Sequence, residues 1–171
     1  MARKRSSDYV HVEHPFEPTY FDDSKILVLG SFPSTKSREA GFYYGHPNNR
    51  FWALLSNLYE KNLPKTIEDK MNFLKDIHIA LYDVISSCDI ISSSDASIKN
   101  AMASNVLDIV HNSSIGKIIC NGRKAGDLFL KYQANQIPNH IKVVVLPSTS
   151  PANAKCSLSD LMTAWGTELF S

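Results

Sequence analysis

Four short apolar runs, separated by helical patterns, constrain the fold of this chain more than any other feature. The runs cover residues 25–30, 77–84, 116–121 and 141–146, and most are nearly continuous stretches of aliphatic side chains. Such runs are typical of strands that are covered on both faces of a parallel sheet. The segments between them leave room for helical crossovers. We therefore expect a layered α/β domain.

Helical patterns occupy most of the sequence between these runs. In residues 48–59, apolar side chains recur at i, i+3, i+4 and i+7, the spacing of an amphipathic helix. Similar patterns predict helices over residues 66–76, 96–111, 122–134 and 157–170. The last of these begins with Ser157 and Asp160 at the spacing of a capping box. The serine-rich segment 86–97 is expected to be a polar loop.

Length and composition restrict the class of protein. The 171 residues carry 18 Lys and Arg against 17 Asp and Glu, which gives a formal net charge of +1, and 43% of them are hydrophobic. These values favour one folded domain over a disordered chain. No apolar run approaches the roughly 20 residues that span a bilayer, so we expect no membrane association. We expect residues 1–20 to form a loosely structured leader and residues 21–171 a single domain.

The cysteines and histidines do not predict a metal site. Three cysteines lie far apart without a C-x-x-C pair, which argues against a disulfide framework or a cysteine-ligated metal. His11 and His14 lie in the predicted leader and lack a clear third ligand. We therefore expect a reducing, cytoplasmic compartment and neither a metal nor a cofactor, and the single compact domain predicts a monomer.

Polar, turn-rich segments follow three of the four predicted strands. They cover residues 30–52, 121–124 and 146–155. Turn formation alone would explain the Gly, Ser and Pro residues in any one of them. Because ligands bind at the carboxyl ends of parallel strands, however, we expect the three loops to meet at one edge of the sheet and to form a binding site.

The chemistry available in these loops is limited. They contain no G-x-x-x-x-G-K-[ST] phosphate loop, no G-x-S-x-G nucleophile and no pair of carboxylates, and His46 is their only imidazole. Three kinds of side chain remain. They are aromatic rings that can stack on a planar ring, amides that can bind its polar edge, and hydroxyls that can bind phosphate. This inventory is typical of a pocket for a nucleobase turned out of DNA. The low net charge implies that any contact with DNA is local.

The loop sequences resemble those of the uracil-DNA glycosylase superfamily. The segment HPNNRFW at residues 46–52 is similar to the H-P-x-N-R-F-W stretch of the mismatch-specific uracil and thymine glycosylases. LPSTSPANA at residues 146–154 is similar to the second motif of the superfamily, and Asn121-Gly122 resembles an N-G pair of thymine-specific members. The resemblance implies a three-layer α/β/α sandwich around a four-stranded parallel sheet in the order 2-1-3-4.

One departure from the uracil-specific members bears on the substrate. Where they carry a water-activating Asn or Asp in the first motif, this chain has Phe32. The first motif, GSFPS at residues 30–34, looks instead like that of the hypoxanthine-DNA (deoxyinosine) glycosylase branch, in which an asparagine of the H-P-x-N segment is implicated in catalysis. The matching residue here is Asn49.

The resemblance therefore implies an enzyme that removes a deaminated base, hypoxanthine above all, from DNA. The reaction would proceed by base flipping and attack of water at C1′. Two alternatives stay open. One is a mismatch-specific uracil or thymine glycosylase, and the other is a non-catalytic module that binds damaged DNA.

The resemblance and the loop chemistry together suggest roles for single residues. Asn49 is the expected catalytic residue, which holds a water through its carbonyl oxygen, and a helix N-cap is its structural alternative. His46 and Asp83 are expected to brace loops. Base-binding roles are predicted for Ser31, Phe32, Tyr44 and Asn121. Contacts with the DNA backbone, or insertion into the base stack, are predicted for Ser34, Ser37, Arg50, Ser148, Thr149, Ser150, Asn153 and Lys155.

Overall fold

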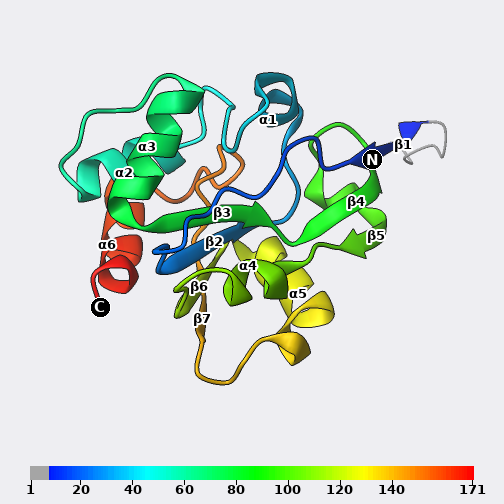
Figure 1. The fold of residues 1–171 in the computed structure, drawn as a ribbon. Coiled ribbons are helices and arrows are strands. Elements are labelled where there is room, and N and C mark those ends of the chain that lie inside the picture. The colour runs from blue at the N-terminus through cyan, green and yellow to red at the C-terminus, as the bar shows by residue number, and fades with distance from the viewer. Residues whose placement is uncertain (1–7) are drawn as a thin grey trace.

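Four parallel strands form the sheet at the centre of the molecule, in a computed structural model that describes residues 8–171 (Figure 1). The sheet has the spatial order β3-β2-β6-β7 and consists of β2 (Ile26–Gly30), β3 (Ile79–Asp83), β6 (Lys117–Asn121) and β7 (Lys142–Leu146). Numbered among themselves, these strands run 2-1-3-4, so the expected sheet is confirmed. The registers pair Gly30 with Asp83 and Asn121 with Leu146, which aligns the carboxyl ends of neighbouring strands at one edge.

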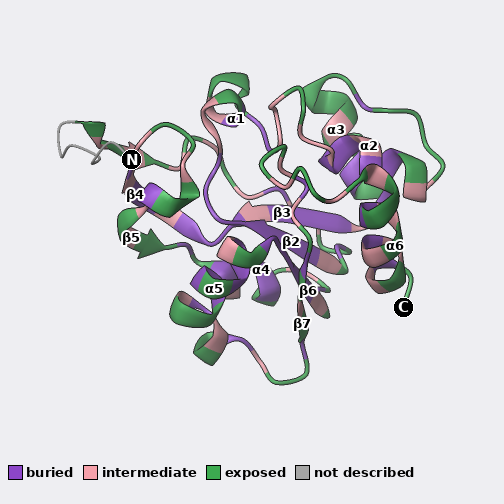
Figure 2. Ribbon diagram, turned by 180° about the vertical axis from the view of Figure 1, so that it is seen from behind, coloured by how far each residue is buried: buried purple, intermediate pink, exposed green. Residues whose placement is uncertain are grey.

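Helices cover both faces of this sheet and complete three layers. One face carries α4 (Val106–His111) and α5 (Arg123–Tyr132), and the other carries α2 (Phe51–Leu58), α3 (Ile67–Ile77) and α6 (Leu158–Leu169). Successive residues of β2 enter two separate cores, because Leu27 and Leu29 pack toward α4 and α5 whereas Val28 packs on the opposite face. Burial of the central strands from both sides explains their continuous apolar sequences (Figure 2). The predicted α/β/α sandwich is confirmed.

Four of the five predicted helices form close to their expected limits, as α2, α3, α5 and α6. The capping box of α6 is present. The Asp160 N–H donates to Ser157 Oγ at 3.1 Å, and the Ser157 N–H donates to Asp160 Oδ2 at 3.0 Å. Two short 3-10 helices, η2 (Asp95–Ser97) and η3 (Ala134–Gln136), lie in the connections.

A second, antiparallel sheet was not expected. It has the order β1-β4-β5 and consists of β1 (Val10–Glu13), β4 (Ile85–Ile90) and β5 (Lys99–Ala103). Residues 86–90 of the predicted loop over 86–97 therefore form a strand, whereas residues 91–97 stay a connection of turns and η2, and the first half of the predicted helix over 96–111 is wrong because β5 occupies it. The serine content of β4 hides its strand character, because a serine side chain can be satisfied within a sheet. Ser86 Oγ, for example, donates to the backbone carbonyl of Met102 at 3.2 Å.

The segment before β2 is more ordered than the predicted leader. Residues 1–7 lie outside the described residues. From there on, β1 pairs with β4, and Thr19 forms an antiparallel bridge with Leu81 of β3. The side chain of His14 is buried against the end of β3. A loose leader therefore does not describe residues 10–19. Between residues 8 and 171 the structure contains no helix long and apolar enough to cross a bilayer.

Candidate functional site

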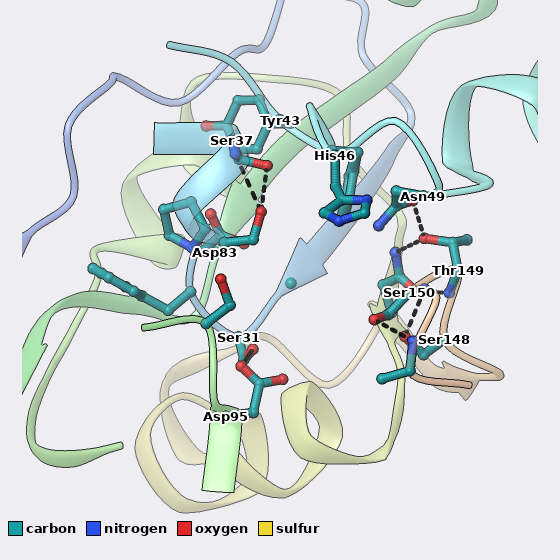
Figure 3. A pocket seen from close by; sticks show the side chains of 18 of the residues that line it. Ser31, Ser37, Tyr43, His46, Asn49, Asp83, Asp95, Ser148, Thr149 and Ser150 are labelled. Carbon is teal, nitrogen blue, oxygen red and sulfur yellow. Dashed lines mark hydrogen bonds between the residues drawn. The ribbon is translucent and has the colours of Figure 1, made fainter. Parts of the chain in front are cut away.

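A cavity of about 340 Å³ opens at the carboxyl edge of the parallel sheet. Tyr44 and Asn49 reach it from the loop after β2, Asn121 from the end of β6, and Ser148 from the loop after β7. The convergence of the three polar loops, predicted from their places after three strands, is confirmed. In Figure 3, Ser31, Asp83 and Asp95 lie on one side of the opening, opposite Asn49, Ser148, Thr149 and Ser150.

A chain of hydrogen bonds ties the three loops together. Asn121 Nδ2 donates to Thr149 Oγ1 at 3.0 Å, and the Thr149 hydroxyl donates to Asn49 Oδ1 at 2.9 Å. The backbone N–H of Thr149 donates to Asn121 Oδ1 at 3.0 Å, which fixes the orientation of that amide. Both ends of the Asn121 amide therefore bind Thr149. Because Thr149 is fully buried, it holds the loops together and cannot enter a base stack, contrary to the prediction.

The side chain of Asn49 has one end free. Its Oδ1 accepts a second hydrogen bond, from the backbone N–H of Phe51 at 3.0 Å, in the first turn of α2. The N-cap of α2 is Arg50, without a side-chain cap bond, so Asn49 stands one residue before the cap position and binds the first N–H of the helix. Two donors occupy both lone pairs of this oxygen, so the water-holding role predicted for it does not fit the structure. Within the described residues Asn49 Nδ2 has no hydrogen-bond partner, and Figure 3 shows the amide facing the cavity. Asn49 therefore presents a donor.

Two of the four serines predicted to bind phosphate have structural roles. Ser34 is the N-cap of α1 (Thr35–Ala40), where it accepts the Ser37 N–H at 3.1 Å and donates its own proton to Ser37 Oγ. Ser37 is only 3% exposed, and its Oγ accepts the backbone N–H of Gly45 at 3.0 Å. This pair braces the loop after β2.

The other two serines keep a proton to donate. Ser148 Oγ and Ser150 Oγ each accept a backbone N–H two residues further along the chain, at 3.1 and 3.2 Å. Both residues are partly exposed and line the cavity. A hydroxyl that accepts one bond can still donate its own proton to a phosphate oxygen.

Arg50 braces the loop after β7 from inside. Its guanidinium donates to the backbone carbonyls of Ser150, Asn153 and Cys156. Asn153 Nδ2 in turn donates to the Ser148 carbonyl at 3.0 Å. The DNA contacts predicted for Arg50 and Asn153 therefore compete with bonds that shape the loop. Lys155 is exposed at the end of the same loop.

Tyr44 shows the signs of a constrained site residue. Its ring lies over Phe51, with ring centroids 4.2 Å apart, so one face is already covered. Its backbone has φ 55, which is uncommon for a bulky residue. The Tyr44 hydroxyl is buried without a hydrogen-bond partner. Burial raises the pKa of this phenol, the charge of Asp83 raises it further, and the nearby Asn121 amide only partly offsets both effects.

Phe32 is part of the core on the α4 and α5 side of the sheet, although it also lines the cavity. Its ring stands edge-on to His14, with centroids 5.9 Å apart. The brace expected for His46 is present, since His46 Nδ1 accepts the Asn48 N–H at 3.0 Å.

Two carboxylates line the cavity, and the sequence assigned neither to binding or catalysis. Asp83 ends β3, and Asp95 comes from η2 between β4 and β5. Ser31 Oγ donates to Asp95 Oδ1 at 2.9 Å, so the hydroxyl predicted to bind the base is already engaged. Asp95 as a residue is exposed, yet desolvation of its carboxyl group raises its pKa, the Ser31 bond lowers it and the charge of Asp83 raises it.

Asp83 and Asp95 differ in whether the sequence contains a signal that could have identified them as site residues. Asp83 stands at the carboxyl end of a predicted strand, which is a sufficient signal for a site residue. Asp95 gives no such signal, because the hairpin that carries it was expected to be a loop and a helix. In the described part of the chain, no group of three or more His, Cys, Asp or Glu side chains is placed to hold a metal ion.

The three-layer fold, with a cavity built by loops at the carboxyl edge of its sheet, defines the protein as an α/β domain whose ligand site lies where the parallel strands end. A sequence profile of the uracil DNA glycosylase superfamily matches residues 18–165. The chain belongs to this superfamily, as its loop motifs had indicated.

Particular relatives include two curated archaeal proteins, both named hypoxanthine DNA glycosylase. The one from Methanosarcina acetivorans is 32% identical over 148 residues, which cover 85% of this chain and 91% of the relative. The one from Methanosarcina barkeri is 29% identical over 154 residues, which cover 88% and 93% of the two chains. A solution NMR structure of a candidate uracil DNA glycosylase from Methanosarcina acetivorans superimposes with a TM-score of 0.77 at 28% identity, and the match covers 95% of this chain and all of the other.

Proposed function

We propose that this protein hydrolyses the N-glycosidic bond of deoxyinosine and so removes hypoxanthine from DNA. The observation that carries the proposal is the unpartnered amide nitrogen of Asn49, which faces a cavity of about 340 Å³. That cavity offers a donor to a planar ring with acceptor atoms, and hypoxanthine has such atoms at O6, N7 and N3. The two curated relatives named hypoxanthine DNA glycosylase support the same substrate.

The base reaches this cavity only after it leaves the duplex. Ser148 and Ser150 are suited to hold the phosphates beside it, because each hydroxyl keeps a proton for an acceptor. Pro151 and Ala152 are exposed at the rim of the cavity and are the part of the loop that can fill the gap in the base stack. Lys155 adds a local positive charge.

Cleavage gives the sugar oxocarbenium character and leaves negative charge on the purine. In our proposal Asn49 Nδ2 donates to the purine as that charge develops, a contribution typically worth about 10²- to 10³-fold in rate. The bound water needs a separate acceptor, because Asn49 Oδ1 is occupied. Asp95 is the proposed acceptor, since Ser31 binds its Oδ1 and no residue in the described structure binds its Oδ2.

The proposed step balances as a hydrolysis. The water oxygen forms a bond to C1′ while the C1′–N9 bond breaks, and the bonding electrons leave with the purine. The water proton passes to the Asp95 carboxylate and then to solvent, and the purine anion takes up a proton. The products are free hypoxanthine and an abasic site.

Labelled oligonucleotides that carry one inosine, xanthine or uracil test the proposal. Treatment with the protein and then with alkali should cut the strand at inosine, because alkali cleaves an abasic site. Faster cutting at uracil would favour the second candidate, a uracil or thymine glycosylase, which the solved relative described as a candidate uracil DNA glycosylase supports. Tight binding to an abasic analogue without cutting at any base would support a non-catalytic module instead.

A further inference from the structure

The floor of the cavity, formed by Gly30, Tyr44 and Asp83, contains a carboxylate oxygen that no side chain uses. The Asp83 side chain is 5% exposed, and its Oδ2 lies 2.7 Å from His14 Nε2. Within the described structure Asp83 Oδ1 has no hydrogen-bond partner, and Asp83 lines the cavity. A Cβ on Gly30 would collide with this oxygen and lie 3.4 Å from the Tyr44 hydroxyl. The absence of a side chain on Gly30 therefore leaves room for two unpartnered polar groups at the floor.

His14 holds Asp83 in this orientation. Its side chain is 3% exposed, and its ring packs against Phe16 and Tyr82 with centroids 4.7 and 4.8 Å away. Nε2 faces the carboxylate, which can only accept, whereas Nδ1 faces the Phe16 N–H at 3.5 Å. These partners assign the proton to Nε2. A buried carboxylate needs such a donor, so the pair is stable only as a unit.

The negative charge of Asp83 reaches several groups around the cavity. After burial, which is the larger cause, it raises the pKa of Tyr43 and Tyr44, and it also contributes to the raised pKa of Asp95. An ionised carboxylate accepts hydrogen bonds and donates none. A ring that presents an N–H to Asp83 Oδ1 is therefore attracted, and a ring that presents a lone pair there is repelled.

We propose that Asp83 is the residue that selects the base, by accepting a ring N–H at Oδ1, and that His14 is the positioning residue that aims it. This inference rests on the proposed function and deepens it. Hypoxanthine carries a hydrogen on N1, where adenine carries a lone pair. A site built to bind such a hydrogen discriminates strongly against a ring that lacks it, because the buried acceptor is then left unpaired. Asp83 thereby separates the deaminated purine from the normal one.

The Asp83→Asn variant tests the first part, with inosine and nebularine as substrates in the same DNA sequence. Nebularine has the purine ring but lacks both N1–H and O6. The wild type should prefer inosine, and an asparagine, which can turn its N–H toward a lone pair, should lower the inosine-to-nebularine ratio of kcat/KM by about 10- to 100-fold, as expected for one hydrogen bond to a charged group. Asp89→Asn is the matched control, because Asp89 also binds a histidine, His11, at 2.9 Å but lies outside the cavity.

Two variants test the second part. His14→Phe keeps a ring in the packing but removes the donor, and it should lower the same ratio. His14→Gln restores an N–H near the position of Nε2 and should recover most of the ratio. A ratio of two kcat/KM values does not depend on the fraction of folded protein, so partial unfolding cannot imitate the effect. His11→Gln serves as the control in the same segment.

The possible results distinguish a failure of the role proposed for Asp83 from a failure of the proposed glycosylase function. If the wild type acts on neither substrate, the proposed function fails and the inference fails with it. If the wild type prefers inosine while Asp83→Asn and His14→Phe keep the wild-type ratio, the inference alone is overturned. If Asp83→Asn is inactive on both substrates, the His14→Phe ratio decides: a lower ratio supports the inference and an unchanged one refutes it.

Discussion

The side chain of Asn49 is oriented by its neighbours. The Phe51 N–H and the Thr149 hydroxyl both donate to Oδ1, so the amide can turn only if both bonds break. The bond from the first residue of α2 and the bond from Thr149 thus determine which end of the amide a ligand meets. A contact with the start of the helix and a free Nδ2 are consequences of one geometry, although a structural role and a site role stood as alternatives in the sequence.

The Asn49→Asp variant separates the two roles proposed for this residue. Aspartate keeps an oxygen for the Phe51 N–H and the Thr149 hydroxyl but replaces the free donor by an acceptor. We expect kcat on inosine DNA to fall about 10²- to 10³-fold, with single-turnover kinetics as the measurement. If the residue instead held the water, aspartate would preserve the activity. Asn48→Asp, which makes the same change at the exposed neighbouring residue, is the control.

The raised pKa of Asp95 leads to a prediction about pH. In the proposed mechanism the carboxylate must be ionised, so kcat/KM should fall as the pH drops through a value above 3.8, the ordinary pKa of an aspartate. Asp95→Asn should remove this acid limb and lower the rate at neutral pH. Asp89→Asn should leave the limb in place, because bonds to Asn100 and His11 lower the pKa of Asp89. An acid limb that persists in Asp95→Asn would contradict the role.

At the scale of the elements, the turn from β6 into α5 is a closely packed junction near the site. Gly122 has φ +99, and a Cβ there would lie 2.8 Å from Ser148 Cβ in the loop after β7. The strand, the helix and the neighbouring loop therefore meet at a position where only glycine fits without strain.

Gly122→Ala should destabilise the protein and slow the reaction. Gly122 has φ 99 and ψ 165, a backbone conformation that is essentially restricted to glycine and costs an alanine roughly 1–3 kcal/mol, and displacement of Ser148 adds to this. We expect Tm to fall by about 2–12 °C in a thermal melt, together with a higher KM for DNA. Gly116→Ala is the matched control: a Cβ at this position would have no neighbouring atom within 4 Å, so its Tm should stay close to that of the wild type. Equal melts for both variants would refute the close-packing argument.

The parallel sheet was predictable because β2, β3 and β6 are buried on both faces and carry an unbroken apolar signal, and because the edge strand β7 keeps an apolar sequence although it is largely exposed. The antiparallel sheet was not, because β4 mixes buried isoleucine and cysteine with serine, and β5 is largely exposed. The consequence for the site is direct. Residues that follow the parallel strands, such as Tyr44, Asn49 and Ser148, were found from sequence, whereas Asp95 was missed. His14 was seen but not placed, because only the pairing of β1 with β4 brings it against Asp83, which lines the cavity.

At the scale of the whole molecule, the near balance of charge bears on the proposed contact with DNA. A formal net charge of +1 gives no general attraction to phosphates, so binding has to come from a few donors around the cavity. Arg50 does not add to them, because its guanidinium binds backbone carbonyls. Lys155, at the end of the loop after β7, is exposed and free to contact a phosphate.

Lys155→Gln should therefore change the salt dependence of DNA binding. Removal of one lysine–phosphate contact lowers the slope of log K against log salt by about 1. Fluorescence anisotropy over a series of salt concentrations measures it. Lys142→Gln, at the opposite end of β7, removes the same charge from a lysine that pairs with Glu168 at 3.1 Å, and should leave the slope unchanged. Equal slopes for wild type and Lys155→Gln would exclude the contact.

In the hydrogen-bond chain, Asn121 donates to Thr149 and Thr149 donates to Asn49. The chain therefore fixes which side of the cavity presents a donor. One wall ends in a donor, and the floor across from it ends in the Asp83 acceptor. A small planar lactam complements both without any sugar or phosphate attached. Under the proposed function, the freed base is therefore itself a starting point for a competitive inhibitor, and a heterocycle with its donor and acceptor atoms exchanged should bind poorly.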